Sequence, residues 1–158
     1  MTDPTSGSGI PYRFDPTTTA AAVEAEYGDL SDGEETGVVV SVAGRLMLRR
    51  DQGKLAFGDL QDATGRVQLF ALQRSTADFA GFTGLHLGDW IGVTGEVLKT
   101  RRGELSIRVD SWVRLAEARR GFPDKWHGMT DVDTRFRQRY VDLWVTDESR
   151  AAFVARSQ

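Results

Sequence analysis

The residues of this chain that could do chemistry are two phenylalanines set among amide and guanidinium side chains. Phe57 and Phe70 alternate with apolar residues in two neighbouring segments, and Gln68 lies two positions before Phe70. Aromatic rings can stack on unpaired bases, amides can hydrogen-bond base edges, and cations can neutralise phosphates. The predicted outer surface holds Arg45, Arg49, Phe57, Arg66, Gln68 and Phe70, beside a hairpin with Lys99, Arg101, Arg102 and Glu104. This combination predicts a site for single-stranded RNA.

Other residue types give no competing site. His86 and His127 are far apart in sequence, and the chain has no cysteine, so we predict no metal site. Asp59 and Asp62 fit strand-end and turn positions better than a catalytic carboxylate pair. No nucleophilic side chain and general base are arranged in the sequence in a way that indicates a catalytic pair. We therefore expect this chain to have no catalytic and no metal-binding residues.

Five segments of alternating apolar and polar residues predict the strands that carry the candidate site. They span residues 38–49, 55–61, 66–71, 90–97 and 104–110. A short helix is predicted from Ser75, with Phe79, Phe82 and Leu85 on its apolar side. Five strands with a helix between the third and fourth indicate an all-β OB-fold, a closed five-stranded barrel with short flanking helices. A small barrel of the SH3 type would lack that helix.

The alternation also assigns each strand position to a face, because successive side chains of a strand point to opposite sides. In the first segment we expect Val38 and Leu48 inside the barrel and Arg45 and Arg49 outside. In the next two segments Phe57 falls on the outer face, together with its candidate partners. An alternative interpretation is that the phenylalanine rings pack beneath an N-terminal helix.

The barrel segment divides the 158 residues into three parts. Residues 1–36 form an acidic extension, with eight acidic residues, one basic residue and a short helix that Gly28 ends. Residues 37–115 form the predicted OB-fold domain. Residues 116–158 are interpreted as a linker and the truncated start of another domain, and helix formers continue to the last residue. We expect residues after about 131 to be disordered or packed against a neighbouring chain.

The composition limits the cellular compartments in which we expect this chain. No apolar run approaches the roughly 20 residues of a membrane-spanning helix, so we expect no membrane association. The first residues lack the basic start and apolar stretch of a signal peptide. The absence of cysteine is compatible with a reducing compartment. These features favour a cytoplasmic protein.

Several motifs resemble one family, the class II lysyl-tRNA synthetases of the bacterial type, in their N-terminal anticodon-binding domain. Within the barrel the resemblance rests on Val42-Ala43-Gly44-Arg45, Gly53-Lys54, Asp59-Leu60-Gln61-Asp62, Gly65-Arg66-Val67-Gln68-Leu69-Phe70 and Gly103-Glu104-Leu105-Ser106. Two later motifs are more specific, Pro123-Asp124-Lys125-Trp126-His127-Gly128 and Arg135-Phe136-Arg137-Gln138-Arg139-Tyr140-Val141-Asp142-Leu143. The resemblance covers about residues 10–158. The barrel motifs alone also fit aspartyl and asparaginyl relatives.

The resemblance implies a role for each candidate residue. Phe57 would stack on the middle anticodon base, Phe70 would support that stack, and Glu104 would accept a hydrogen bond from the third base. Gln68 and Arg45 would hydrogen-bond the middle uracil. The implied backbone contacts are Arg49, Lys54, Lys99 and Arg101. Phe70 stands where the family often has tyrosine, which removes a hydroxyl but keeps the ring.

The resemblance also implies a larger parent enzyme. The parent would join lysine to its tRNA with ATP and Mg²⁺, and it would form a homodimer. This chain would be inactive alone, because the catalytic domain would begin near Asp147 and lie mostly beyond Gln158. It would have no cofactor of its own, and its partner would be the anticodon loop of a lysine tRNA. Two further alternatives stay open: a generic OB module that binds any single strand, and a structural OB domain that binds protein.

Overall fold

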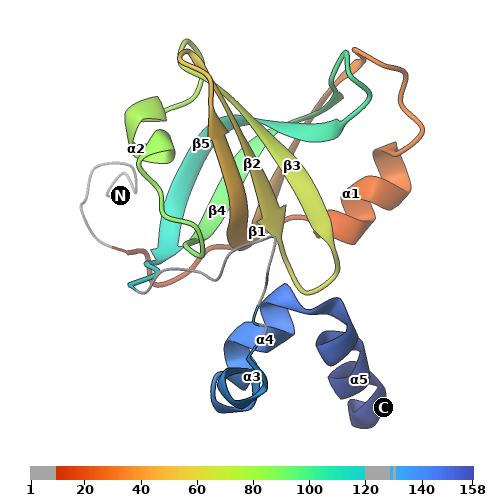
Figure 1. Ribbon diagram of the computed structural model, residues 1–158. Coiled ribbons are helices and arrows are strands. Elements are labelled where there is room, and N and C mark those ends of the chain that lie inside the picture. The colour runs from red at the N-terminus through yellow and green to blue at the C-terminus, as the bar shows by residue number, and fades with distance from the viewer. Residues whose placement is uncertain (1–9, 120–128, 130) are drawn as a thin grey trace. The chain divides into compact units, whose positions relative to one another are not determined.

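The structure, a computed structural model, describes residues 10–119, 129 and 131–158 (Figure 1). The chain divides into two compact units, Met1–Arg120 and Gly121–Gln158, and each is described by itself. The motif expected at residues 123–128 and the tail at residues 1–9 lie outside the described residues.

The first unit is a five-stranded sheet that closes into a barrel. The strands are β1 (Glu35–Asp51), β2 (Leu55–Gln61), β3 (Arg66–Leu72), β4 (Trp90–Lys99) and β5 (Leu105–Ala116). Their order is β1-β2-β3-β5-β4, and β1 pairs with both β2 and β4. β3 and β5 run parallel, and the other pairs are antiparallel (Figure 1). The five predicted strands are confirmed, although β1 and β5 are longer than expected.

The inner faces of the strands form one core, as the period of two residues predicted. A β carbon on Gly95 would collide with the carbonyl oxygen of Arg108, so glycine lets β4 and β5 approach closely at this point. Val38 is 40% exposed and stays outside the core, against the expectation, because the register shifts between Glu35 and Val39. The strand residues of the hydrophobic core are Val40, Val42, Leu46, Ala56, Leu60, Val67, Leu69, Ala71, Ile91, Val93, Val97, Ile107 and Val109.

A β-bulge interrupts the alternation of β1. Leu46 pairs with Leu60, whereas Leu48 pairs with Asp59, so Met47 is an extra residue on the β1 side. A bulge of this kind leaves two residues opposite one and shifts the strand by one position. Side chains after the bulge therefore lie on the opposite face from the one that strict alternation assigns.

The bulge overturns two sequence predictions. Leu48 was expected inside and Arg49 outside, but Leu48 now shares the outer face with Asp59, while Arg49 pairs with the buried Gly58. The next residue, Arg50, pairs with Phe57 and occupies the outer position expected of Arg49. The placement of both side chains was wrong because nothing in the alternating apolar pattern marks the bulge.

Helix α1 (Ala20–Tyr27) is anchored at the β2–β3 turn. Thr19 caps its first turn by accepting from Ala22 N, and Asp62 Oδ2 accepts from Ala20 N at 2.8 Å. Ala20 and Val23 are buried in the barrel core. The predicted helix ending at Gly28 is confirmed.

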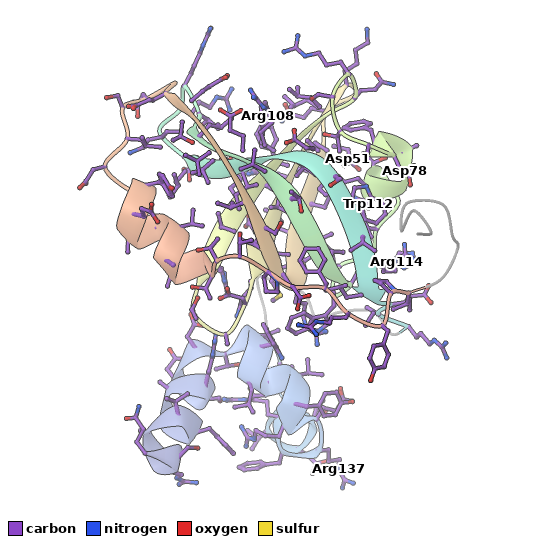
Figure 2. All side chains as sticks on the ribbon, turned by 180° about the vertical axis from the view of Figure 1, so that it is seen from behind. Asp51, Asp78, Arg108, Trp112, Arg114 and Arg137 are labelled. Carbon is purple, nitrogen blue, oxygen red and sulfur yellow. The ribbon has the colours of Figure 1, made fainter. Side chains whose placement is uncertain are left out.

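Helix α2 (Phe79–Thr83) connects β3 to β4 in the chain. It begins later than the expected Ser75, because Asp78 caps it by accepting from Gly81 N at 3.0 Å. The Trp112 indole donates to the carbonyl oxygens of Ala77 and Asp78, and its ring contacts the buried Phe82 (Figure 2). These contacts fix α2 against β5.

The second unit contains α3 (Val132–Arg137), α4 (Arg139–Val145) and α5 (Asp147–Ser157). The expectation of disorder is therefore wrong for residues 131–158. The buried Asp142 joins the helices, since it accepts from Arg135 Nε at 2.9 Å and Thr146 Oγ1 at 2.8 Å and also from Arg139. Among the described residues, no helix has the length and apolar character needed to cross a bilayer.

Candidate nucleic-acid interface

Two aromatic rings form the centre of the candidate interface. Phe57 of β2 and Phe70 of β3 are directly paired on the outer face, with ring centroids 5.4 Å apart and planes inclined by 31°. Both side chains are half-buried. Neither belongs to the core or to the side chains packed against it, so the alternative in which they pack beneath α1 does not hold. The pair offers a flat apolar surface to solvent.

An oriented amide lies next to this aromatic pair. Gln68 is two positions before Phe70 on β3, and it pairs with Asp59 on one side and Ser106 on the other. Ser106 Oγ lies 2.9 Å from Gln68 Oε1 and donates to it. Among the described residues, no acceptor is recorded for the amide nitrogen of Gln68. Ser106 Oγ also lies 3.1 Å from Glu104 O, and its single proton can be donated to only one of these acceptors at a time. When it is donated to Gln68 Oε1, the amide N–H groups of Gln68 are available to a ligand.

The hairpin between β4 and β5 carries the second group of candidate residues. Thr100 N donates to Glu104 O at 2.9 Å, and Glu104 N donates to Thr100 Oγ1 at 3.1 Å. These bonds close the hairpin, and Gly103 takes a left-handed φ of 82° within it. The side chains of Arg101, Arg102 and Glu104 are exposed. A carboxylate acceptor and two cations thus stand at the rim of the barrel.

The arginine beside the aromatic pair is Arg50, which sequence reasoning missed. It is exposed and pairs with Phe57 in register. The predicted Arg49 instead donates to Leu85 O and forms an ion pair with Asp51 at 3.2 Å. Only the position of the bulge distinguishes these adjacent arginines, and the sequence pattern carries no signal for it.

Arg45 lies on the outer face but is turned away from the aromatic pair. Its guanidinium donates to Gly88 O at 3.1 Å and lies 5.4 Å from the centre of the Trp90 ring. Trp90 belongs to β4, which flanks β1 on the side opposite β2. Burial lowers the pKa of Arg45, although an arginine remains protonated at physiological pH. The structure does not bring Arg45 together with Phe57 and Gln68.

The remaining predicted cations lie in two different environments. Lys54 is exposed in the turn between β1 and β2. Lys99 is half-buried, and its Nζ donates to Gly28 O at the end of α1 with a distance of 3.0 Å. Lys54 is thus open to a ligand, whereas Lys99 already has a partner within the barrel unit.

Arg108 is a further residue at this surface. It pairs with Phe70 across β3 and β5, and it forms ion pairs with Glu35 at 3.1 Å and with Glu96 (Figure 2 labels Arg108). Two carboxylates, one from β1 and one from β4, therefore hold its guanidinium. The alternation placed Arg108 on the outer face, but its pairing with Phe70 depends on the β3–β5 register.

Asp62 has the turn role that its sequence position suggested. Burial would raise its pKa, but hydrogen bonds from Ala20 N, from Thr64 and from Gly65 N outweigh that effect and lower it. Across the described residues, no group of three or more histidines and carboxylates is placed to hold a metal ion.

Sequence comparisons with known proteins agree with the OB-fold assignment. Residues 40–115 match the family model tRNA_anti-codon, described as an OB-fold nucleic acid binding domain. A lysine–tRNA ligase of Parasynechococcus marenigrum (strain WH8102) is 48% identical over 157 residues, covering 94% of this chain and 31% of the relative. The predicted resemblance and the OB-fold with five strands are thereby confirmed.

Two further lysine–tRNA ligases show the same relation. One from Synechococcus sp. (strain RCC307) is 46% identical over 153 residues, covering 94% of this chain and 30% of the relative. One from Prochlorococcus marinus (strain MIT 9313) is 46% identical over 165 residues, covering 96% and 32%. The chain thus spans about a third of the length of the relatives that it matches.

Proposed function

Because residues 40–115 match the family model tRNA_anti-codon, an OB-fold nucleic acid binding domain, we propose that the outer β2–β3 face binds the anticodon loop of a lysine tRNA. The observation that carries this proposal is the pair of half-buried rings of Phe57 and Phe70 beside the oriented amide of Gln68. An unpaired base can stack on such a ring while its edge reaches a neighbouring amide.

The middle anticodon base would stack on Phe57, with Phe70 supporting the ring. Gln68 is the diagonal neighbour of Phe57 across β2 and β3, a separation of about 7–8 Å that long side chains bridge. A uracil presents carbonyl oxygens, which match the amide N–H donors of Gln68. A cytosine places an amino donor at one of those positions, so the same contact would set a donor against a donor.

The third anticodon base would lie at the β4–β5 hairpin. Lysine codons begin with two adenines, so the middle and third anticodon bases are both uracil. The N3–H of uracil is a donor, and the exposed carboxylate of Glu104 can only accept. Glu104 is therefore the proposed reader of the third base.

Exposed cations would neutralise the RNA backbone around these bases. We propose Arg50, Lys54 and Arg101 for this role, because all three are exposed at the rim of the interface. RNA contacts by Arg45 and Arg49 stay predictions, and each guanidinium already donates one of its N–H groups to a backbone carbonyl oxygen.

For the whole protein we propose ATP-dependent joining of lysine to its tRNA, as the names of the relatives suggest. ATP and Mg²⁺ are proposed for that protein, and no residue of this chain is assigned to them. A homodimer and a cytoplasmic location are likewise proposals for the whole protein.

Anticodon selectivity tests the proposed function. Three stem-loops are titrated against the chain at one salt concentration: the lysine anticodon, its middle uracil changed to cytosine, and its third uracil changed to cytosine. Each wrong base should weaken binding by about 1–3 kcal/mol, or about 5–150-fold. Gln68→Met should remove selectivity at the middle base only, and Gln138→Met in the second unit serves as the matched control.

The other outcomes separate the alternatives. Equal affinity for all three stem-loops would indicate a generic single-strand module. Tighter binding of the stem-loop whose third uracil is changed to cytosine would indicate an aspartyl-type domain, because aspartate codons begin with guanine. An asparagine anticodon shares both uracils with lysine and differs at its first base, so preference for a stem-loop with guanine at that base would indicate an asparaginyl-type domain. No measurable binding to any stem-loop would favour the protein-binding OB domain.

A further inference from the structure

We propose that the acidic loop at residues 29–34, together with Lys99, is a positioning element that sets the β4–β5 hairpin for reading the third anticodon base. This inference rests on the proposed function of Glu104. It assigns Lys99 to a contact within the protein, in place of the predicted phosphate contact. It also gives the acidic extension a function in specificity, although its residues need not touch RNA.

Main-chain hydrogen bonds attach the loop to the base of the hairpin. Lys99 N donates to Glu34 O at 2.9 Å, and Gly33 N donates to Lys99 O at 3.1 Å. Glu35 pairs with Leu98 directly below. The chain before β1 thus extends the β1–β4 pairing up to the first residue of the hairpin.

The loop also touches the part of the hairpin that precedes Glu104. A β carbon on Gly33 would lie 3.4 Å from Arg101 Cγ, and one on Gly103 would lie 3.2 Å from Asp32 Oδ1. Both glycines take a left-handed φ of 82°, which side chains rarely adopt. Contacts on either side of the hairpin therefore depend on glycine at each of these two positions.

Lys99 ties the hairpin to α1. Its Nζ donates to Gly28 O at 3.0 Å, where the end of the helix leaves carbonyl groups without helical partners. A cation at a helix C-terminus is also favoured by the helix dipole. Asp62 anchors the other end of α1 to the β2–β3 turn. The hydrogen bond from Lys99 therefore holds the hairpin at a fixed position relative to the barrel.

This arrangement suits a side chain that recognises a single base by a hydrogen bond. Glu104 is the residue directly after Gly103, and its own side chain is exposed with no ion pair recorded among the described residues. A carboxylate on a free hairpin would meet a base in many orientations, whereas a hairpin held at its base and side presents the carboxylate in one. The loop and Lys99 thus act through Glu104.

The test measures base selectivity, because a phosphate contact and a positioning contact have different effects on it. Lys99→Met should lower the ratio of affinities for third-base uracil over cytosine at least about threefold and leave the middle-base ratio unchanged. The salt dependence of binding should stay that of the wild type. Loss of a phosphate contact would instead weaken all stem-loops alike and reduce the salt slope by about 0.7. Lys99→Arg, which can still donate to Gly28 O, should restore selectivity.

A second variant probes the loop without changing charge. Gly33→Ala strains the left-handed φ of a residue whose N–H donates to Lys99 O, whereas Gly37→Ala strains a φ of 69° at a residue outside the loop with nothing within 4 Å. Both should cost similar stability, but only Gly33→Ala should lower third-base selectivity. Melting curves of the full 158-residue chain verify that each variant is folded.

Failure of this inference differs from failure of the proposed function. If the wild type distinguishes third-base uracil from cytosine and both Lys99→Met and Gly33→Ala keep that ratio, the positioning role is refuted alone. A uniform loss of affinity with a reduced salt slope for Lys99→Met would assign Lys99 to a phosphate. If the wild type shows no third-base selectivity, the proposed recognition of the third base by Glu104 and the positioning role are both refuted.

Discussion

Removal of the Phe57 ring is the most direct perturbation of the candidate interface. Stacking of a base on one aromatic side chain contributes about 1–3 kcal/mol, so Phe57→Ala should raise the Kd for the lysine anticodon stem-loop by about 5–150-fold. The change also breaks the ring pair with Phe70, whose centroids are 5.4 Å apart, at a cost of about 0.5–1.5 kcal/mol of stability.

The loss of stability should leave the barrel folded. Phe57 is half-buried, so its truncation should cost less than the about 3–5 kcal/mol typical of a fully buried phenylalanine. Phe82 is completely buried in the core, and Phe82→Ala should show that larger cost. A single domain with about 5–15 kcal/mol of stability tolerates the smaller loss at 25 °C.

The assay is fluorescence anisotropy of a labelled stem-loop at fixed salt, with a thermal melt of each variant. Phe57→Leu separates stacking from apolar bulk, because leucine keeps most of the volume but has no flat face. It should bind nearly as weakly as Phe57→Ala. Phe136→Ala removes a ring that is 69% exposed in the second unit and serves as the matched control. A Kd for folded Phe57→Ala equal to that of the wild type would refute the stacking role.

Two further predictions follow from the geometry. Arg50→Ala should weaken RNA binding and lower the salt slope by about 0.7, whereas Arg49→Ala should mainly lower the melting temperature; the reverse result would place the β1 bulge elsewhere. Burial would raise the pKa of Asp142, but hydrogen bonds from Ser149, Thr146 and Arg135 lower it to about 2. The stability that its ionised form gives to α3–α5 should be complete above about pH 4 and be lost as the pH falls through about 2. Carboxyl chemical shifts from NMR give that midpoint directly, and a value near 4 would contradict the buried network.

The outward direction of Phe57, Gln68 and Phe70 could be predicted from the sequence for a simple reason. β2 and β3 pair without a register shift, so a period of two residues holds from end to end. Once Leu60 is assigned to the core in β2 and Leu69 in β3, residues at an odd number of positions from them on the same strand must face outward. The same reasoning gave the short helix α1, because a threonine cap and Gly28 delimit it locally.

The arginines could not be assigned in the same way. Arg49 and Arg50 are adjacent and chemically identical, and their faces depend on an extra residue at Met47 within a stretch that is apolar on both sides. Arg45 lies on the predicted face, but its direction depends on Trp90 of β4, a contact 45 residues away in the sequence. Long flexible side chains choose their partners by tertiary contacts, which local periodicity does not describe.

The structure also changes what the charge of the barrel implies about binding. Residues 37–115 carry 11 basic and 8 acidic side chains, a surplus that by itself suggests general attraction to polyanions. Arg108, however, is held by two glutamates, and Arg49 is paired with Asp51. Arg114 pairs with the buried Asp89.

Other cations therefore remain for phosphates. Among residues 37–115 the exposed cations are Arg50, Lys54, Arg66, Arg74, Arg101 and Arg102, and six phosphate contacts on a single strand would correspond to a salt slope of about −4. A generic single-strand module depends on a charged groove along its whole length. A generic module also uses stacking, which accepts any base, so the Phe57 ring adds affinity but not selectivity. The proposed hydrogen bonds of Gln68 and Glu104 depend on the identity of the base, and through them we expect this surface to prefer a particular anticodon over other single strands.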